Sequence, residues 1–235
     1  MVVPGLFDAA TMARMASWTE ALQGSPEAPG KFMMYFENSL LESAGRVLSR
    51  IENFVPYHSG FADVVGGDEL LGRTSELFGE PAVLFKDKIN FKLPGGDGFK
   101  AHQDIQAGWE IYAGLFITAL VSIDAATVEN GCLELAAGAH TRGALGENWR
   151  PLTDEELDGV EFMPCRTQPG DVVFFDSFTP HRSAPNLTSA PRRVLYITYN
   201  QRFEGDHRER YFADKRKSYP PDCEREPGKT YAYRV

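Results

Sequence analysis

The stretch KINFKLPGGDGFKAHQD, residues 88–104, carries the most information about the fold of this 235-residue chain. It begins with alternating polar and apolar residues, is interrupted at Pro94, and ends in the triplet His102-Gln103-Asp104. The side chains of an extended backbone alternate between two faces, so His102 and Asp104 point to the same side. The stretch therefore predicts a strand whose end presents an imidazole and a carboxylate together.

A second histidine, His181, lies far along the chain. If another strand brings it to His102 and Asp104, a metal ion would have three protein ligands on one face and open positions opposite them. Non-haem Fe(II) oxygenases use this arrangement, which leaves the open positions for a cosubstrate and O2. A closed structural zinc site would need four protein ligands, usually with thiolates, and the sequence has no such cluster. His102, Asp104 and His181 are therefore the predicted catalytic metal ligands.

The patterns along the chain predict helices first and strands afterwards. Apolar residues recur at helical spacing over residues 8–23, 37–54 and 68–78, and the second of these stripes consists of Leu40, Leu41, Ala44, Val47, Leu48 and Ile51. Strand-like segments follow at 82–93, 114–124, 132–137, 171–177 and 193–203, and a short helix is expected at 207–217. This order favours a mainly β fold with flanking helices, built on a double-stranded β-helix (jelly roll, cupin-like) core.

The whole chain, residues 1–235, is expected to form one domain. Its parts would be N-terminal helices over about 1–80, the jelly-roll core over about 81–205, and a polar C-terminal segment over 206–235.

The composition limits the classes of protein to which the chain can belong. A hydrophobic content of 43% is typical of a folded protein, and a net charge of −9 argues against nucleic-acid binding. No apolar run reaches the roughly 18–20 residues of a membrane span. Three widely separated cysteines and a start without a signal-peptide pattern favour a cytoplasmic location. A monomer or homodimer that acts on a small molecule fits these properties.

Four segments resemble the phytanoyl-CoA dioxygenase family, and they occur in the family's order: KINFKLPGGDGFKAHQD (88–104), NGCLE with the later AGAH (130–140), PGDVVFFDSFTPHRSAPN (169–186) and APRRVLYITYN (190–200). The resemblance covers roughly residues 80–205. It implies a jelly-roll fold, Fe(II), 2-oxoglutarate as cosubstrate together with O2, and iron ligation by His102, Asp104 and His181.

The same resemblance assigns Arg192, eleven residues beyond His181, to the far carboxylate of 2-oxoglutarate. A dicarboxylate needs a fixed cation at its non-chelating end, and the planar guanidinium can donate two parallel hydrogen bonds to it. Arg193 is the rival candidate, but its side chain should point to the opposite face. Ser183 matches a family position with a small hydroxyl near this carboxylate, although capping of the loop is an equally good role for it.

Lys86, Lys88, Asn90 and Lys92 share one face of a strand, and two interpretations of this face stay open. In an ordinary sheet the face would be solvated, whereas in a jelly roll it can point into the cavity. In the second case Lys92 would help to bind 2-oxoglutarate, as a family lysine does, and Lys88 and Asn90 would meet the substrate. Buried lysines would then need anionic partners.

Some further residues are candidates for supporting roles. Gln103 points away from the metal and is expected to support the loop. Thr118, or Leu120 on the same strand face, could line the cosubstrate pocket. Trp109 and Tyr112 follow the metal motif closely and could shape the substrate entrance or pack in the core.

The activity implied by the resemblance is hydroxylation of a C–H bond, with release of succinate and CO2. Related halogenating enzymes have a small residue at the position of Asp104, so the aspartate favours hydroxylation. The substrate could be a small polar, anionic molecule such as an aminoalkylphosphonate, or a secondary metabolite. Three alternatives stay open: desaturation or isomerisation in place of hydroxylation, a catalytically inactive metal-binding or sensing protein, and a hydrolase that holds another divalent metal.

Overall fold

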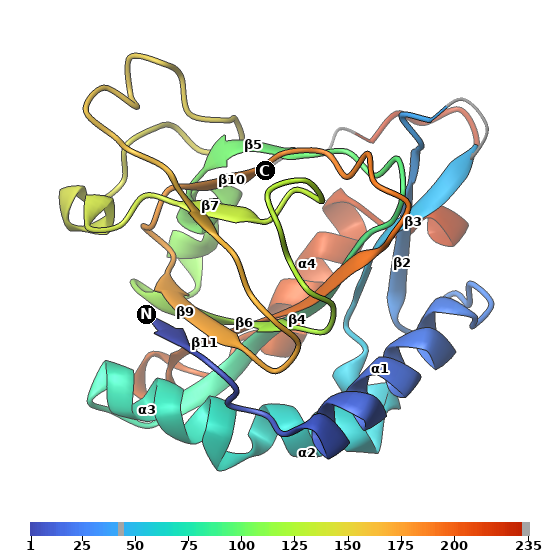
Figure 1. Ribbon diagram of the computed structural model, residues 1–235, viewed down its shortest axis with the longest axis horizontal. Coiled ribbons are helices and arrows are strands. Elements are labelled where there is room, and N and C mark those ends of the chain that lie inside the picture. The colour runs from blue at the N-terminus through green and yellow to red at the C-terminus, as the bar shows by residue number, and fades with distance from the viewer. Residues whose placement is uncertain (42–44, 232–235) are drawn as a thin grey trace.

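Two antiparallel β-sheets form the centre of the protein, as the computed structural model shows for residues 1–41 and 45–231 (Figure 1). The larger sheet has seven strands in the order β1 (Val2–Val3), β9 (Val172–Asp176), β6 (Phe116–Ser122), β11 (Arg192–Gln201), β4 (Ala82–Lys92), β3 (Arg46–Glu52) and β2 (Met33–Asn38). The smaller has four, in the order β5 (Phe99–His102), β10 (His181–Ser183), β7 (Leu133–Leu135) and β8 (Met163–Cys165). This is the mainly β, jelly-roll architecture that the sequence predicts.

Three helices cover the outer face of the seven-stranded sheet: α1 (Ala9–Gln23), α2 (Ser59–Gly66) and α3 (Arg73–Phe78) (Figure 1). Helix α1 starts at Asp8, whose carboxylate accepts a hydrogen bond from the Thr11 backbone N–H at 2.7 Å. The helices and the sheet bury one large apolar cluster, which includes Met15, Phe61, Val65, Ile89, Phe91, Val121, Leu195 and Ile197. A register shift near Phe85 interrupts the alternation of β4, and from Lys86 to Lys92 the even-numbered residues point to the other face, between the sheets.

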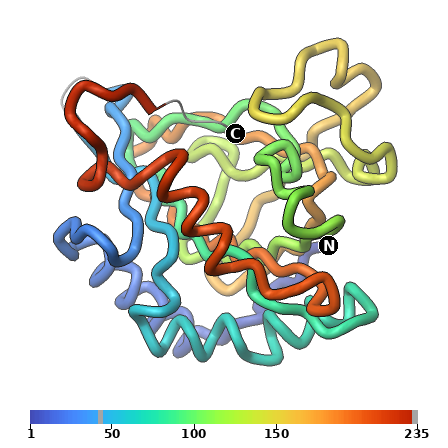
Figure 2. The backbone as a smooth tube through the Cα atoms, turned by 180° about the vertical axis from the view of Figure 1, so that it is seen from behind, coloured from blue at the N-terminus to red at the C-terminus, as the bar shows by residue number. Residues whose placement is uncertain are grey.

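The fourth helix, α4 (Arg208–Ser218), is separate from these three. Figure 2, which views the molecule from behind, shows it running diagonally across the side that Figure 1 hides. Short 3₁₀ segments complete the described elements: Val55–Tyr57, Asp104–Ala107, Trp109–Ile111, Ala139–Arg142, Arg202–Glu204 and Asp222–Glu224.

The predicted helix over 37–54 is wrong. Its described residues belong to the hairpin of β2 and β3, and Ala44 lies outside the described residues. The register of this hairpin shifts so that Phe36 pairs with Leu48 and Tyr35 with Arg50, which leaves Ser49 as an extra residue. Such a bulge reverses the alternation of the strand. Leu48 and Ile51 therefore both reach the apolar core, at a spacing that resembles a helix.

The other predicted elements are confirmed, with shifted ends. The helix at 8–23 is α1, the one at 207–217 is α4, and the one at 68–78 is a π-helical turn (Asp68–Gly72) that continues into α3. All five predicted strands occur, whereas α2, β1 and β8 were not predicted. None of the helices in residues 1–41 and 45–231 combines the length and apolarity that a membrane crossing requires.

Candidate active site

The smaller sheet brings the predicted metal ligands together. In the pairing of β5 with β10, His102 lies opposite His181, and Asp104 follows at the start of the next 3₁₀ turn. One ligand atom from each of the three side chains lies within 4.8 Å of the other two. The distance from His181 Nε2 to Asp104 Oδ1 is 3.9 Å. This spacing allows a single ion to contact all three side chains.

Backbone carbonyls orient both imidazole rings. His102 Nδ1 lies 2.7 Å from the Lys100 carbonyl oxygen, and His181 Nδ1 lies 3.0 Å from that of Thr179. A carbonyl can only accept, so each Nδ1 carries the proton and each Nε2 keeps its lone pair. Burial, followed by repulsion from His181, lowers the pKa of His102 to about 3. The His102 ring thus presents the neutral form that binds metals.

Gln103 holds the loop between the two ligands of the HxD motif. Its side chain is fully buried and donates to the carbonyl oxygens of Gly143 (2.8 Å) and Phe178 (2.6 Å). Its own carbonyl accepts a hydrogen bond from the Leu145 N–H at 2.8 Å. The side chain therefore points away from the ligand atoms and fixes the backbone that carries them, as the sequence predicts.

A cluster of positive charge lies behind the metal ligands. Lys92 and Arg192 are register partners on β4 and β11, and both are buried. Lys92 Nζ donates to Ser183 Oγ at 2.7 Å, and Ser183 is two residues beyond His181. Arg192 contacts the Tyr196 hydroxyl, but its Nε has no hydrogen-bond partner. In the described part of the chain, no carboxylate lies within 4.0 Å of either cation.

The structure separates the two candidate arginines. Arg193 lies on the opposite face, where its Nε and one terminal nitrogen each donate to an Asp124 carboxylate oxygen at 2.8 Å. Its charge is thereby compensated, whereas that of Arg192 is not. Thr118 is buried and shares a hydrogen bond with Thr198 at 2.9 Å, but it is not among the residues that line the cavity. Its predicted contact with a cosubstrate stays a prediction.

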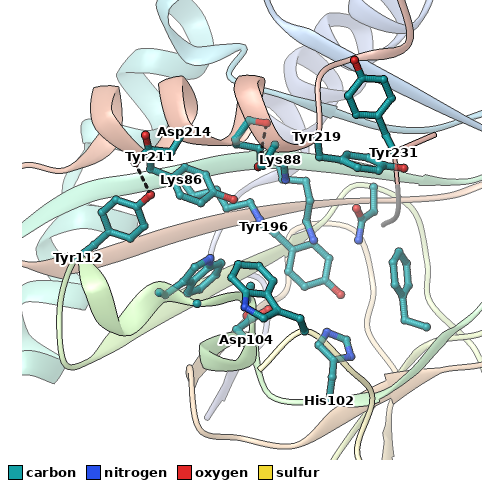
Figure 3. Close-up of a pocket in the computed structure, with 18 of the residues that line it drawn as sticks. Lys86, Lys88, His102, Asp104, Tyr112, Tyr196, Tyr211, Asp214, Tyr219 and Tyr231 are labelled. Carbon is teal, nitrogen blue, oxygen red and sulfur yellow. Dashed lines mark hydrogen bonds between the residues drawn. The ribbon is translucent and has the colours of Figure 1, made fainter. Parts of the chain in front are cut away.

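A cavity of about 610 Å³ lies between the sheets and α4 (Figure 3). The side chains of His102 and Asp104 reach it from one side, and those of Lys86 and Lys88 from the other. Asn90 also lines it and is buried, with no partner for its amide oxygen. The polar face of β4 thus points into the cavity, so the solvated interpretation is wrong.

The two lysines have different surroundings. Lys86 is 9% exposed, and its Nζ lies 5.1 Å from the centre of the Trp109 ring. Lys88 is half-buried, with its Nζ 4.4 Å from the centre of the Tyr196 ring. Burial, followed by repulsion from Lys86, lowers the pKa of Lys88 to about 7. An anion bound between these lysines would restore the ordinary preference for the protonated form.

Sequence reasoning missed the contribution of the C-terminal segment. Tyr211, Asp214, Lys215 and Tyr219 line the cavity from α4 and its end (Figure 3). Most residues of α4, RERYFADKRKS, are charged, so its sequence predicts a solvated helix or a lid. No local pattern could show that one of its faces closes a polar cavity.

Trp149 is a further cavity residue that the sequence does not reveal. Its ring packs directly over Gly108, where an added Cβ would clash with it. Gly108 also has a φ of 73°, a conformation that favours glycine. The Trp149 N–H donates to the Gln106 carbonyl oxygen at 2.8 Å, which ties this loop to the metal motif.

Comparisons with known proteins agree with this geometry. The model of the phytanoyl-CoA dioxygenase (PhyH) family matches residues 1–194. The chain is 43% identical over 229 residues to a 2-aminoethylphosphonate dioxygenase from an uncultured bacterium (HF130_AEPn_1), covering 97% of this chain and 87% of the relative. It is 39% identical over 218 residues to a methylphosphonate hydroxylase from Gimesia maris, covering 92% and 82%.

Solved structures share the fold at lower identity. EctD from S. alaskensis, solved with 2-oxoglutarate and 5-hydroxyectoine, has a TM-score of 0.73 at 20% identity and covers 86% of this chain and 71% of its own. The epimerase SnoN from nogalamycin biosynthesis, in complex with Fe3+, α-ketoglutarate and nogalamycin RO, has a TM-score of 0.70 at 20% identity, covering 86% and 78%. With its family match extending over residues 1–194 and its relatives aligned over almost the whole chain, this protein belongs to the phytanoyl-CoA dioxygenase family.

Proposed function

We propose that this protein is an Fe(II)- and 2-oxoglutarate-dependent oxygenase that hydroxylates a C–H bond of a small organophosphonate, with release of succinate and CO2. The observation that carries this proposal is the placement of Ser183. It lies two residues from His181 of the ligand triad and contacts Lys92 of the uncompensated cationic cluster. A ligand that bridges a metal and a buried cation through two carboxylate ends matches this arrangement.

His102, Asp104 and His181 would hold the iron. Two neutral imidazoles and one carboxylate are a ligand set that suits Fe(II) and leaves coordination positions open. When bound, the iron supplies the activation of O2. The protein would orient the two histidines for this role. The carbonyls of Lys100 and Thr179 bind each Nδ1 and so keep each Nε2 directed at one point.

Arg192, Lys92 and Ser183 would hold the far carboxylate of 2-oxoglutarate. The buried Arg192 Nε without a partner is an unsatisfied donor, which a carboxylate oxygen would satisfy. The far carboxylate would thus supply the negative charge that Arg192 and Lys92 lack, while the other carboxylate would lie at the metal. Arg193, compensated by Asp124, would take no part.

Lys88 and Asn90 would bind and orient the substrate. Both lie on the stretch of β4 between the cationic cluster and Lys86, and both line the cavity. The names of the two relatives, a 2-aminoethylphosphonate dioxygenase and a methylphosphonate hydroxylase, support an organophosphonate over a secondary metabolite. Trp149 and Tyr219 at the cavity wall would limit the access of water.

The alternative of an inactive metal-binding protein is less well supported. Metal binding alone would not require, beside the metal ligands, a buried arginine and a buried lysine that have no carboxylate within 4.0 Å in residues 1–41 and 45–231. We also retain the predictions of a cytoplasmic location and of a monomer or homodimer.

The test is an anaerobic titration of the Fe(II) protein with 2-oxoglutarate, followed through the visible metal-to-ligand charge-transfer band. We expect a saturable band that disappears in His102→Ala. In Arg192→Ala the affinity should fall roughly 100-fold, as expected for a lost charge-assisted pair. The neighbouring Arg193→Ala is the matched control and should keep the affinity within a few fold. Bound iron without a band at any 2-oxoglutarate concentration would contradict the proposal.

A further inference from the structure

We propose that Lys86 and Lys88 form one subsite that selects a doubly charged anionic head group, in which Lys86 recognises the second charge. This inference rests on the proposed function and deepens it. It states that the charge of the head group, and not only its tetrahedral shape, decides which molecules are substrates.

The two lysines are placed to act on the same group. They stand two residues apart on β4, so their backbones are separated by roughly 6.6 Å and their side chains project to one face. Both line the cavity, and Figure 3 shows both chains extending into it from the side opposite His102. Side chains of this length can converge on one head group.

Neither ammonium has an acidic partner of its own. Within residues 1–41 and 45–231, no carboxylate oxygen lies within 4.0 Å of either Nζ. Glu52 is paired with Lys88 in register but is already contacted by Lys215 at 2.6 Å and Arg50 at 2.9 Å, and the buried Asp87 between the two lysines is paired with Arg208. Asp104 is committed to the candidate metal site. Glu52 and Asp104 act on Lys88 only at longer range, so one buried and one half-buried ammonium have no carboxylate in contact and favour an anion from outside.

Aromatic rings hold Lys86 in place without neutralising it. Its Nζ lies 5.1 Å from the centre of the Trp109 ring and 5.6 Å from that of Tyr211. Ring faces attract an ammonium and replace part of its hydration, but they leave its full charge available to a ligand. Lys86 is thus held for binding by one residue near the metal motif and one from α4.

The charge of the whole cavity supports two charges on the ligand. Its charged lining residues, apart from the histidines, are five lysines and two aspartates: Lys86, Lys88, Lys215, Lys217, Lys229, Asp104 and Asp214. Lys215 is paired with Glu52 and Lys229 with Glu226, so Lys86, Lys88 and Lys217 carry the positive charge of this lining that has no carboxylate within 4.0 Å in the described part of the chain. A singly charged sulfonate would leave one buried ammonium uncompensated, whereas a phosphonate dianion would compensate both.

The experiment compares head groups of equal shape and different charge. The anaerobic Fe(II)–2-oxoglutarate protein is titrated with 2-aminoethylphosphonate and with 2-aminoethanesulfonate, and then with methylphosphonate and methanesulfonate. A pH of about 8.5 keeps the phosphonates largely doubly ionised, because the second pKa of an alkylphosphonate is higher than the value of about 6 for a phosphate ester. The shift of the charge-transfer band, or calorimetry, gives each dissociation constant in the native protein, in Lys86→Gln and in the exposed control Lys31→Gln.

We expect the native protein to prefer at least one phosphonate to its sulfonate by roughly 10- to 100-fold. Lys86→Gln should lose most of that preference by weakening phosphonate binding, with sulfonate binding changed less than about 3-fold. Lys31→Gln should keep the full preference. An unchanged 2-oxoglutarate band in Lys86→Gln would show that the variant folds.

The outcomes separate this inference from the proposed function. Equal loss of phosphonate and sulfonate in Lys86→Gln, or equal affinity of the native protein for both, would overturn the inference while the 2-oxoglutarate band stands. If neither phosphonate bound to the native protein, the inference would also be overturned. The absence of the band itself would instead overturn the proposed function.

Discussion

Lys92 is a buried ammonium whose strongest charged neighbour is another cation. Burial, and then repulsion by Arg192, lowers its pKa to about 7. A carboxylate of 2-oxoglutarate would favour the protonated form and raise this pKa again, so binding above pH 7 would take up a proton. We expect the affinity for 2-oxoglutarate to fall above about pH 7, by up to about 10-fold per pH unit. Dissociation constants measured by band titration between about pH 6 and 9 test this.

The control for this pH dependence is Lys92→Met. It should bind 2-oxoglutarate weakly at every pH, with a flatter profile above pH 7. Calorimetry of the native protein in two buffers of different ionisation enthalpy should show proton uptake at about pH 8. An affinity that does not change across this range would refute the assignment of Lys92.

Gln103 has a structural task between two ligand residues. Removing its side chain would leave the carbonyls of Gly143 and Phe178 and the N–H of Leu145 without their buried partner. We expect Gln103→Ala to lower the free energy of unfolding by roughly 2–4 kcal/mol, as several unsatisfied buried groups would. Urea unfolding measures this. The exposed Gln168→Ala should change it by less than about 0.5 kcal/mol, and an equally small effect of Gln103→Ala would count against the supporting role.

Helix α4 is anchored to the large sheet by a buried ion pair. Arg208 donates to Asp87 Oδ1 at 2.5 and 3.2 Å, and the other oxygen of Asp87 accepts from the Phe54 and Val55 N–H groups. Arg208→Ala leaves the fully buried Asp87 without a cation and should cost about 3 kcal/mol or more.

The effect of Arg208→Ala should be local to the cavity wall. Faster hydrogen exchange of the α4 amides and a higher KM for the substrate are expected, with the 2-oxoglutarate band unchanged. Arg210→Ala, which removes an exposed pair at 3.8 Å, should have little effect on stability. If the two variants behaved alike, the Arg208–Asp87 pair would not be the anchor of the helix.

Local patterns predicted the elements whose burial follows one simple period. The strands β6, β9 and β11 are buried on both faces, β4 alternates regularly from Lys86 to Lys92, and the HxD motif needs only an extended backbone. The prediction failed for the hairpin of β2 and β3, because a bulge at Ser49 places Leu48 and Ile51 in the same core, as a helix would. The pattern alone cannot distinguish these two causes.

The cavity could be predicted only in part for a related reason. The polar face of β4 was visible in the sequence, but its direction depends on the second sheet and on α4, which lie far away along the chain. The side chains of α4 that line the cavity are held by distant partners, such as Glu52 for Lys215, and no local spacing encodes those contacts.

At the scale of the whole molecule, the ligand residues are joined across short strands of the smaller sheet. His102 and His181 come from β5 and β10, which are four and three residues long. A metal bound by both should stabilise the folded state by mass action, by about 2.7 kcal/mol at 100 times the dissociation constant. For a chain of this size we expect Tm to rise by roughly 5–10 °C.

Thermal unfolding under anaerobic conditions, with Fe(II) and then with a chelator in excess, tests this. His181→Ala should unfold at the same temperature in both conditions, because one of the three ligands is missing. A metal-dependent shift that survives in this variant would mean that the ion binds elsewhere.

One stretch of strand β4, from Lys86 to Lys92, carries both the proposed anchor for the cosubstrate at Lys92 and the proposed lysine pair for the head group. Its length between these points is a whole number of backbone repeats, and a slip of one residue would turn every side chain to the wrong face. The protein can therefore alter this reach only in steps of roughly 6.6 Å, much longer than one carbon–carbon bond. If both groups bind as proposed, the spacing between Lys92 and the lysine pair would determine which substrate carbon lies nearest the metal. A substrate that is longer by one methylene would have to bend for the same carbon to be oxidised.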